Sequence, residues 1–210
     1  MGDPDVPASP GAGPVSGGVP VWLLDIDGVV NAIGSRPDRS TWPSWRQLDA
    51  DCRGETWPIL CAEPVLEFLR RVHDAGAAEV RWHTTWQDEA LMLGELLDLP
   101  SFKVQPCPEY DNGEAVGGAR PVGASWWKLP AAERVVGVEG RDLVWTDDDA
   151  QWELKTHRPI MDNPGPFTRV LNQVLVISPH QRLGLSRKHL RRIAEFLDVD
   201  WPGSPGWPLT

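Results

Sequence analysis

Hydrophobic and polar positions follow two different periods along the chain. Short, nearly continuous apolar runs predict strands that are covered on both faces, and segments with apolar residues three and four apart predict amphipathic helices. Strands that alternate with helices are typical of a parallel sheet, so the pattern predicts an α/β, Rossmann-like three-layer fold with a five-stranded, mainly parallel sheet. The predicted strands are Val21 to Asp25, Glu79 to Thr84, Phe102 to Gln105, Asp142 to Thr146 and Gln173 to Ser178.

Three helical segments have recognisable ends. Gly76 is predicted to end the first helix. The acids Asp88 and Glu89 lie at the start of the second helix, where their negative charge interacts favourably with the positive end of the helix dipole. Ser186 is a predicted cap for the third. The predicted helices are Glu63 to Asp74, Asp88 to Leu97 and Ser186 to Leu197.

Several segments do not follow this alternation of strands and helices. Residues 1 to 20 and 201 to 210 are rich in proline, glycine and small residues, which predicts a disordered arm and a tail whose two tryptophans can dock on the domain. Between them, 21 to 200 reads as one domain. Within it, Asn31 to Leu60 is a long irregular stretch that leaves directly after the first strand, and we predict a flap or small hairpin, a minimal cap, over the site. Pro106 to Ser125 is predicted to form part of the same rim.

The chain has a formal net charge of -10, which disfavours broad binding to nucleic acid or anionic membranes. We expect no extended nucleic-acid track, although the outer face of the last predicted helix is basic. No apolar stretch reaches the roughly 20 residues of a membrane span, and no signal-peptide pattern is present, so we expect a cytoplasmic protein without a membrane partner. The three cysteines suit neither a disulfide framework nor a zinc site and are interpreted as reduced and structural. The oligomeric state stays open.

Two aspartates end the first predicted strand, in VWLLDIDGVVN. Asp25 and Asp27 are one residue apart, so an extended backbone directs them to the same side while Ile26 points away. In open α/β sheets ligands bind beyond the carboxyl ends of the strands. A pair this close can share a metal or divide the roles of nucleophile and acid/base. A calcium loop is excluded, because the sequence runs on into Val29 and Val30 instead of further oxygen ligands.

Three other element ends carry groups that suit phosphoryl transfer. Thr84, preferred to Thr85, ends the second strand with a hydroxyl for a phosphoryl oxygen. Lys128 precedes a short helix and supplies a positive charge. The fourth strand runs into Asp147 and two further acids, and such crowding is costly unless a cation is present. Mg²⁺, which prefers carboxylates and phosphate, is the natural cation for this site.

Taken in order, these residues resemble the motifs of the haloacid dehalogenase-like (HAD) superfamily of phosphatases and phosphotransferases. The DIDGV segment is similar to the first motif, Thr84 to the second, Lys128 to the third and the TDDD cluster to the fourth. The details WHTTW, WKLP, WTDDD and GLS before a helix are most similar to the HAD domain of Swiss-army-knife RNA repair proteins and its stand-alone bacterial relatives.

The resemblance implies a role for each residue. Asp25 is the expected nucleophile, Asp27 the acid/base, and Thr84 and Lys128 hold the transferring oxygens. Mg²⁺ is expected on the Asp25 carboxylate, the Asp27 main-chain carbonyl and an acid of the fourth motif. Asp148 is the most similar of these acids, Asp147 stays open as a ligand, and Asp149 is expected only to cap the next helix.

The leading hypothesis is a Mg²⁺-dependent phosphatase that hydrolyses a phosphomonoester through an aspartyl-phosphate. The phosphorylated substrate is a small molecule or a nucleic-acid end. One alternative is a phosphotransferase that uses the same intermediate. Another is a non-catalytic HAD-fold binding protein with a tryptophan-rich flap, an idea favoured by the 12 tryptophans.

Three further polar residues near the site are assigned structural roles. Arg81 and His83 are expected on the sheet face opposite to Thr84, packed or paired rather than catalytic. Asn31 is expected in a turn, with orientation of the flap or contact with substrate as alternatives.

Overall fold

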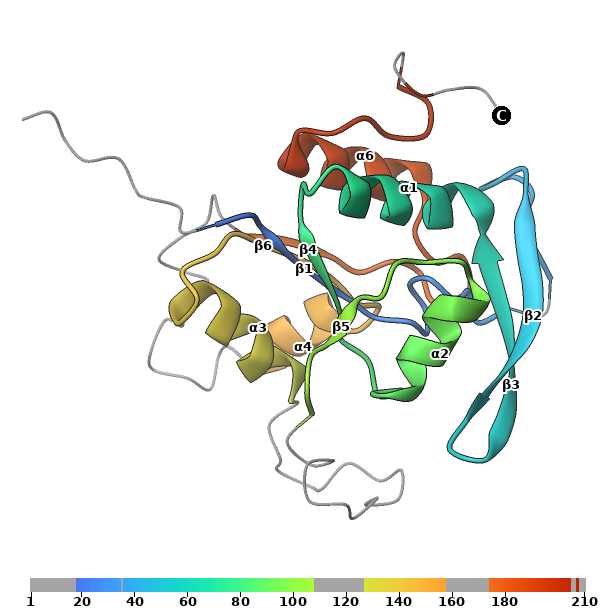
Figure 1. Cartoon of the computed structure of the whole chain (residues 1–210), viewed down its shortest axis with the longest axis horizontal. Coiled ribbons are helices and arrows are strands. Elements are labelled where there is room, and N and C mark those ends of the chain that lie inside the picture. The colour runs from blue at the N-terminus through green and yellow to red at the C-terminus, as the bar shows by residue number, and fades with distance from the viewer. Residues whose placement is uncertain (1–17, 35, 108–126, 158–173, 205–206, 208–210) are drawn as a thin grey trace, which may run out of the picture.

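The computed structural model describes residues 18–34, 36–107, 127–157, 174–204 and 207. Its centre is a five-stranded sheet in the order β5-β4-β1-β6-β7, and every pairing in it is parallel. Helices cover both faces of the sheet (Figure 1), so the predicted α/β, Rossmann-like three-layer fold is confirmed. The strands are β1 (Val21–Leu24), β4 (Glu79–Trp82), β5 (Lys103–Val104), β6 (Leu143–Thr146) and β7 (Val174–Ile177).

Strand β1 is the middle strand, and all four of its residues are buried. Alternate side chains supply two separate hydrophobic clusters, because successive residues of a strand point to opposite faces. Trp22 and Leu24 belong to the larger cluster, whereas Val21 and Leu23 belong to the smaller one. A strand of this kind needs apolar residues at every position, which is why the continuous run VWLL predicted it correctly.

The helices fall into two groups. Helices α1 (Glu63–Asp74), α2 (Glu89–Leu96) and α6 (Arg187–Leu197) contribute to the larger cluster. Helices α3 (Lys128–Gly137) and α4 (Ala150–His157) lie on the other face, below the sheet in Figure 1, where α3 fills the smaller cluster.

The ends of the predicted elements lie within about one residue of the observed ends, with a larger difference at the end of β4. Helix α1 begins and ends as predicted, and Gly76 follows it with a φ of 61°. The second strand was predicted to reach Thr84, but β4 ends at Trp82, because His83 is the last residue whose main-chain nitrogen bonds to β1, at Leu24. Lys128 was expected before its helix and is instead the first residue of α3.

The predicted flap contains an antiparallel hairpin, β2 (Trp45–Cys52) and β3 (Glu55–Ala62). It lies at the right of Figure 1 and runs directly into α1. The tip half of β3 is exposed, whereas its last four residues are buried. At the entry to the hairpin, the indole nitrogen of Trp42 donates to the carbonyl of Leu185 at 2.8 Å. The hairpin is therefore anchored at its base.

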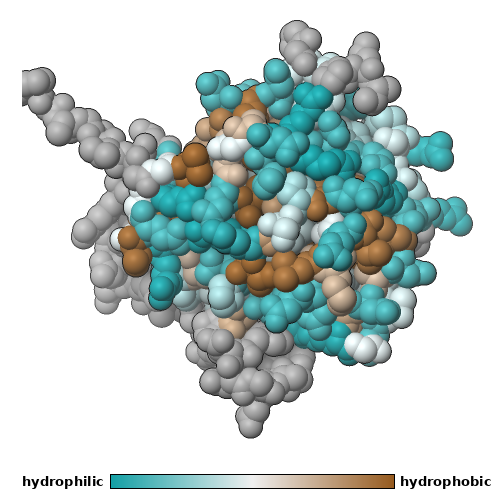
Figure 2. Space-filling model, viewed as in Figure 1, coloured by the Kyte–Doolittle hydropathy of each residue, from teal (hydrophilic) through white to brown (hydrophobic). Residues whose placement is uncertain are grey.

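The surface of the view in Figure 1 is mostly hydrophilic, with hydrophobic side chains gathered in a band across its middle (Figure 2). Exposed apolar residues include Leu91, Met92 and Leu96 of α2. No helix in the described ranges is both long and apolar enough to cross a membrane.

The tail and the cysteines behave as predicted where the structure describes them. The ring of Trp207 lies 6.4 Å from the ring of Phe68, and the guanidinium of Arg71 lies 4.1 Å from the centre of the Trp207 ring. Trp207 therefore docks on α1. Cys52, Cys61 and Cys107 are buried, and none of the three forms a disulfide. Burial raises the pKa of the Cys61 thiol. The predicted arm up to residue 17 and the rim segment from residue 108 to 125 lie outside the described residues.

Candidate active site

Asp25 and Asp147 share one ammonium group at the carboxyl ends of the neighbouring strands β1 and β6. The Nζ of Lys128 donates to Oδ2 of Asp25 and to Oδ2 of Asp147, each at 2.6 Å. All three side chains are buried, with 9% or less of each exposed. The other oxygen of Asp25 accepts a hydrogen bond from the main-chain nitrogen of Ile26 at 2.8 Å. The Asp25 carboxylate is thus fixed in orientation before any ligand arrives.

Lys128 occupies an unfavourable place for a cation. It is the first residue of α3, where the helix dipole is positive, and its ammonium is removed from water. Burial alone would lower the pKa of Lys128, but the charges of Asp25 and Asp147 outweigh burial and raise it. The two carboxylates therefore keep the lysine charged at a position that helix formation alone would not select.

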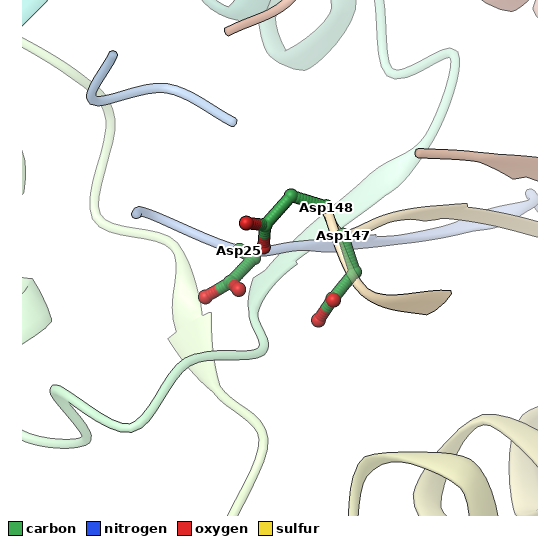
Figure 3. Close-up of side chains that lie close together, drawn as sticks. All are labelled: Asp25, Asp147 and Asp148. Carbon is green, nitrogen blue, oxygen red and sulfur yellow. The ribbon is translucent and has the colours of Figure 1, made fainter. Parts of the chain in front are cut away.

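Asp148 completes a cluster of three carboxylates. One oxygen from each of Asp25, Asp147 and Asp148 lies within 4.8 Å of the others, and the three side chains lie together in Figure 3. Asp148 can approach because residue 28 is glycine. A Cβ at Gly28 would lie 2.6 Å from the carboxyl carbon of Asp148, and the φ of +74° at this residue also favours glycine.

Burial and mutual repulsion hold this cluster in an electrostatically costly state. Burial, with repulsion from Asp147, raises the pKa of Asp25 to about 8, although Lys128 opposes the shift. Burial, with repulsion from Asp147 and Asp149, raises the pKa of Asp148 to about 6. With all three carboxylates ionised, one ammonium would leave two negative charges uncompensated, which matches the charge of a divalent cation.

Asp147 also helps to start helix α4. Its Oδ1 accepts a hydrogen bond from the main-chain nitrogen of Asp149 at 3.0 Å. Asp149 was expected to cap this helix, but the capping-type contact in the structure comes from the Asp147 side chain. Asp147 and Asp148 both belong to the carboxylate cluster, whereas Asp149 is exposed and does not.

Asp27 is held by a separate set of partners. Its Oδ1 accepts a hydrogen bond from Nδ2 of Asn31 at 2.9 Å, and its Oδ2 accepts one from the indole nitrogen of Trp86 at 2.8 Å. Asp27 is only partly buried. The two aspartates of the DIDG segment are therefore close in sequence but form hydrogen bonds with different partners.

Asn31 connects this aspartate to the hairpin. Its Oδ1 accepts a hydrogen bond from the main-chain nitrogen of Leu60 at 2.9 Å, while its main-chain oxygen closes the turn by accepting from Gly28. Asn31 thus lies in the predicted turn and also contacts the hairpin, whereas its orientation of the flap stays a prediction.

Thr84 lies in the loop after β4 and is buried. Its hydroxyl oxygen accepts a 3.4 Å hydrogen bond from the main-chain nitrogen of Trp86, and its carbonyl accepts one from Nε2 of Gln87 at 2.6 Å. Thr84 thus supports the residue that binds Asp27. Its position follows from this turn rather than from strand alternation.

Arg81 and His83 are packed or paired, as predicted. Arg81 forms a two-pronged ion pair with Glu139. His83 is fully buried, and its ring lies 4.9 Å from that of Trp127. Burial, with the nearby charge of Lys128, holds the pKa of His83 well below its usual value, so this imidazole is neutral.

Two pockets open beside Asp27, and Trp57 of the hairpin lines both. The smaller, of about 320 Å³, also contains Arg53 and Trp86. The guanidinium of Arg53, at the hairpin tip, donates to the carbonyl of Thr85. The larger pocket, of about 780 Å³, is lined among others by Ile33, Pro58, Leu183, Arg36 and Arg182.

Sequence reasoning did not assign Trp86, Trp57, Arg36 or Arg182 to the site. Trp86 carried the one available signal, because it follows Thr84 in the WHTTW segment, but a tryptophan pattern does not show what its nitrogen binds. The arginines come from segments far apart in the chain, before the hairpin and before α6, and no spacing joins them.

The chain was compared with models of protein families, with curated proteins and with solved structures, and none of these comparisons gave a match.

Proposed function

We propose that the protein is a Mg²⁺-dependent phosphatase that hydrolyses a phosphomonoester through an aspartyl-phosphate on Asp25. The observation that carries this proposal is that the two aspartates of the DIDG segment have different partners. Asp25 lies against Lys128 in the buried carboxylate cluster, while Asp27 is held at the pocket wall by Asn31 and Trp86. One carboxylate is thus suited to attack and the other to proton transfer.

The residues of the cluster fit a magnesium ion. Three carboxylate oxygens within 4.8 Å of one another form a hard donor set. Burial and mutual repulsion raise the pKa values of Asp25 and Asp148, and a divalent cation would offset that repulsion. Asp25, Asp147 and Asp148 would hold the ion, and the main-chain carbonyl of Asp27 stays a predicted fourth ligand. When bound, the ion would neutralise the phosphate charge and help to orient it.

The chemical steps then use the side chains of the chain itself. An oxygen of Asp25 attacks phosphorus, the bond from phosphorus to the leaving oxygen breaks, and Asp27 gives its proton to that oxygen. Asp27 next removes a proton from water, which attacks phosphorus and breaks the bond to Asp25. Phosphate leaves, and Asp25 is restored as a carboxylate while Asp27 is protonated again.

Lys128 and Thr84 would hold the transferring oxygens. Lys128, whose ammonium already lies against Asp25 and Asp147, would offset the negative charge of a phosphoryl oxygen beside Asp25. The Thr84 hydroxyl accepts from Trp86 and would donate its own hydrogen to a phosphoryl oxygen. Both groups are neutral or positive, as the negative charge of the transferring group requires.

The proposal is tested by phosphate release from 4-nitrophenyl phosphate with and without Mg²⁺, using the wild type, Asp25→Asn and a matched control, Asp49→Asn. Asp49 is an exposed acid on the hairpin strand β2. We expect Mg²⁺-dependent release that Asp25→Asn abolishes and Asp49→Asn preserves. Activity retained in Asp25→Asn contradicts the nucleophile assignment. Transfer of phosphate to an added alcohol at the expense of release favours the phosphotransferase alternative.

A further inference from the structure

The larger pocket beside Asp27 has the size of a site for a small organic molecule. Its volume of about 780 Å³ lies within the range of typical ligand pockets, roughly 300 to 1,000 Å³. Because Asp27 is the proposed proton donor to the leaving oxygen, this pocket adjoins the point where the leaving group departs. Its lining therefore determines which leaving groups are accepted.

Two arginines and two aspartates, Asp27 and Asp38, line this pocket, and the arginines are not paired with either acid. Arg36 and Arg182 both line it, and neither side chain forms an ion pair or side-chain hydrogen bond with a residue that the structure describes. The pocket also contains Asp38, but its carboxylate accepts hydrogen bonds from Ser40 and Thr41. The two guanidinium groups are thus available to an anion, for which their planar donors are well suited.

The same pocket offers an apolar surface for a flat ring. Trp57 and Ile33 are each 48% exposed, although both are large hydrophobic residues, and Pro58 and Leu183 line the pocket beside them. An exposed indole on a pocket wall is a stacking platform for aromatic ligands.

The smaller pocket is less suited to this role. Its arginine, Arg53, already donates to the carbonyl of Thr85, and its volume is about 320 Å³. Glu55 adds a negative charge to its wall. An anionic leaving group therefore favours the larger pocket.

We propose that the larger pocket binds a leaving group that combines a flat ring with a second anionic group, so that the preferred substrate class is a phosphomonoester such as a nucleoside bisphosphate. Arg36 and Arg182 bind the second anion, and Trp57 stacks on the ring. This inference rests on the proposed phosphatase function, because Asp27 links the pocket to the reaction.

The test compares three probes with Mg²⁺ present. Adenosine 3′,5′-bisphosphate carries both features, adenosine 5′-monophosphate carries only the ring, and fructose 1,6-bisphosphate carries only the second anion. We expect kcat/KM for the first probe to exceed that for each of the others by at least about tenfold, the gain expected of one charge-assisted contact.

Variants then assign the preference to the pocket. Arg36→Gln and Arg182→Gln should each reduce the preference for the bisphosphate over the monophosphate by about tenfold, and Trp57→Ala should reduce the preference for adenosine bisphosphate over fructose bisphosphate. Arg39→Gln is the matched control. This arginine is exposed on the same segment as Arg36 but does not line the pocket, and the preference should be unchanged.

The outcomes separate the two proposals. Hydrolysis of 4-nitrophenyl phosphate without a preference for the bisphosphate, or a preference that the arginine variants do not reduce, overturns this inference and leaves the phosphatase function in place. Absence of phosphate release from every probe, including 4-nitrophenyl phosphate, overturns the phosphatase function and this inference with it.

Discussion

The indole nitrogen of Trp86 donates a 2.8 Å hydrogen bond to Asp27, a residue 59 positions earlier in the chain. This contact joins the loop after β4 to the turn after β1. It directs one oxygen of the proposed acid/base, and Asn31 directs the other. The orientation of Asp27 is therefore set by two residues that carry no charge.

Replacement of Trp86 by phenylalanine should remove the donor while keeping an aromatic ring in the core. We expect kcat to fall by about tenfold or more, since a misdirected acid/base loses much of the 10²- to 10⁴-fold contribution of proton transfer. KM should change less. The control is Trp207→Phe, at a tail residue whose ring packs against α1. Equal loss in both variants, measured by steady-state kinetics, contradicts a specific role for Trp86.

Lys128→Met should leave Asp25 and Asp147 buried without their shared cation. Breaking a buried ion pair from one side costs about 3 to 5 kcal/mol, and we expect a loss of this size in the free energy of unfolding without metal. Added Mg²⁺ should recover part of it by binding the same carboxylates. The measurement is urea unfolding with and without Mg²⁺. A variant as stable as the wild type in metal-free buffer would show that the lysine does not hold the cluster together.

Gly28→Ala tests the close approach of Asp148, and Gly54→Ala is its matched control. Both glycines have positive φ, +74° and +78°, but a Cβ at Gly54 meets no atom within 4 Å. The control should lose only the cost of the left-handed backbone, about 1 to 2 kcal/mol. Gly28→Ala should lose more stability and also bind Mg²⁺ more weakly, because Asp148 must move. Titration calorimetry and thermal unfolding measure both effects, and identical behaviour of the two variants refutes the crowding argument.

Glu79 should govern part of the acid stability from the end of the sheet away from the site. Partial burial would raise the pKa of Glu79, but hydrogen bonds from Arg81, Arg141 and Lys103 outweigh it and lower that pKa from 4.5 to about 2. Since the folded pKa is depressed, the stabilisation is present above pH 4.5 and is lost as the pH falls through about 2.

Glu79→Gln should therefore lower the free energy of unfolding near neutral pH by about 1 to 2 kcal/mol, a value reduced for the partial exposure of the side chain. Its stability should also fall less steeply than that of the wild type between pH 4.5 and pH 2. Glu95→Gln, on the exposed side of α2, serves as the control. If the free energies of unfolding of the wild type and Glu79→Gln fall in parallel between pH 4.5 and pH 2, the hydrogen bonds of Glu79 with Arg81, Arg141 and Lys103 are not the cause.

Elements were predicted correctly where the apolar periodicity agrees with the residues that mark the ends of the element. Helix α1 was placed correctly because its apolar periodicity and its Gly76 stop coincide. Helix α4 was not placed, since Ala150 to His157 has weak apolar periodicity and directly follows the aspartate cluster. The hairpin was expected only in outline, because β3 changes from an exposed half to a buried half without alternation and the alternation of β2 is confined to its second half.

The cluster of Asp25, Asp147 and Asp148 could be anticipated for a topological reason. Strands β1 and β6 are neighbours in a parallel sheet, so the acids that follow them lie at the same edge. The wall of the larger pocket could not be anticipated, because Arg36 and Arg182 meet only when the segment before α6 packs beside the turn after β1. That packing depends on Gly184, where a Cβ would lie 2.6 Å from the carbonyl oxygen of Val29.

Strand β3 is divided along its length into an exposed half at the tip of the hairpin and a buried half at its base. A substitution in the buried half disturbs the core and risks unfolding, whereas a substitution at Trp57 alters what the pockets contact. Ligand preference and structural stability are thus assigned to different halves of one strand. Changes at the tip can accumulate during evolution, and can be screened in the laboratory, with the rest of the domain left as it is.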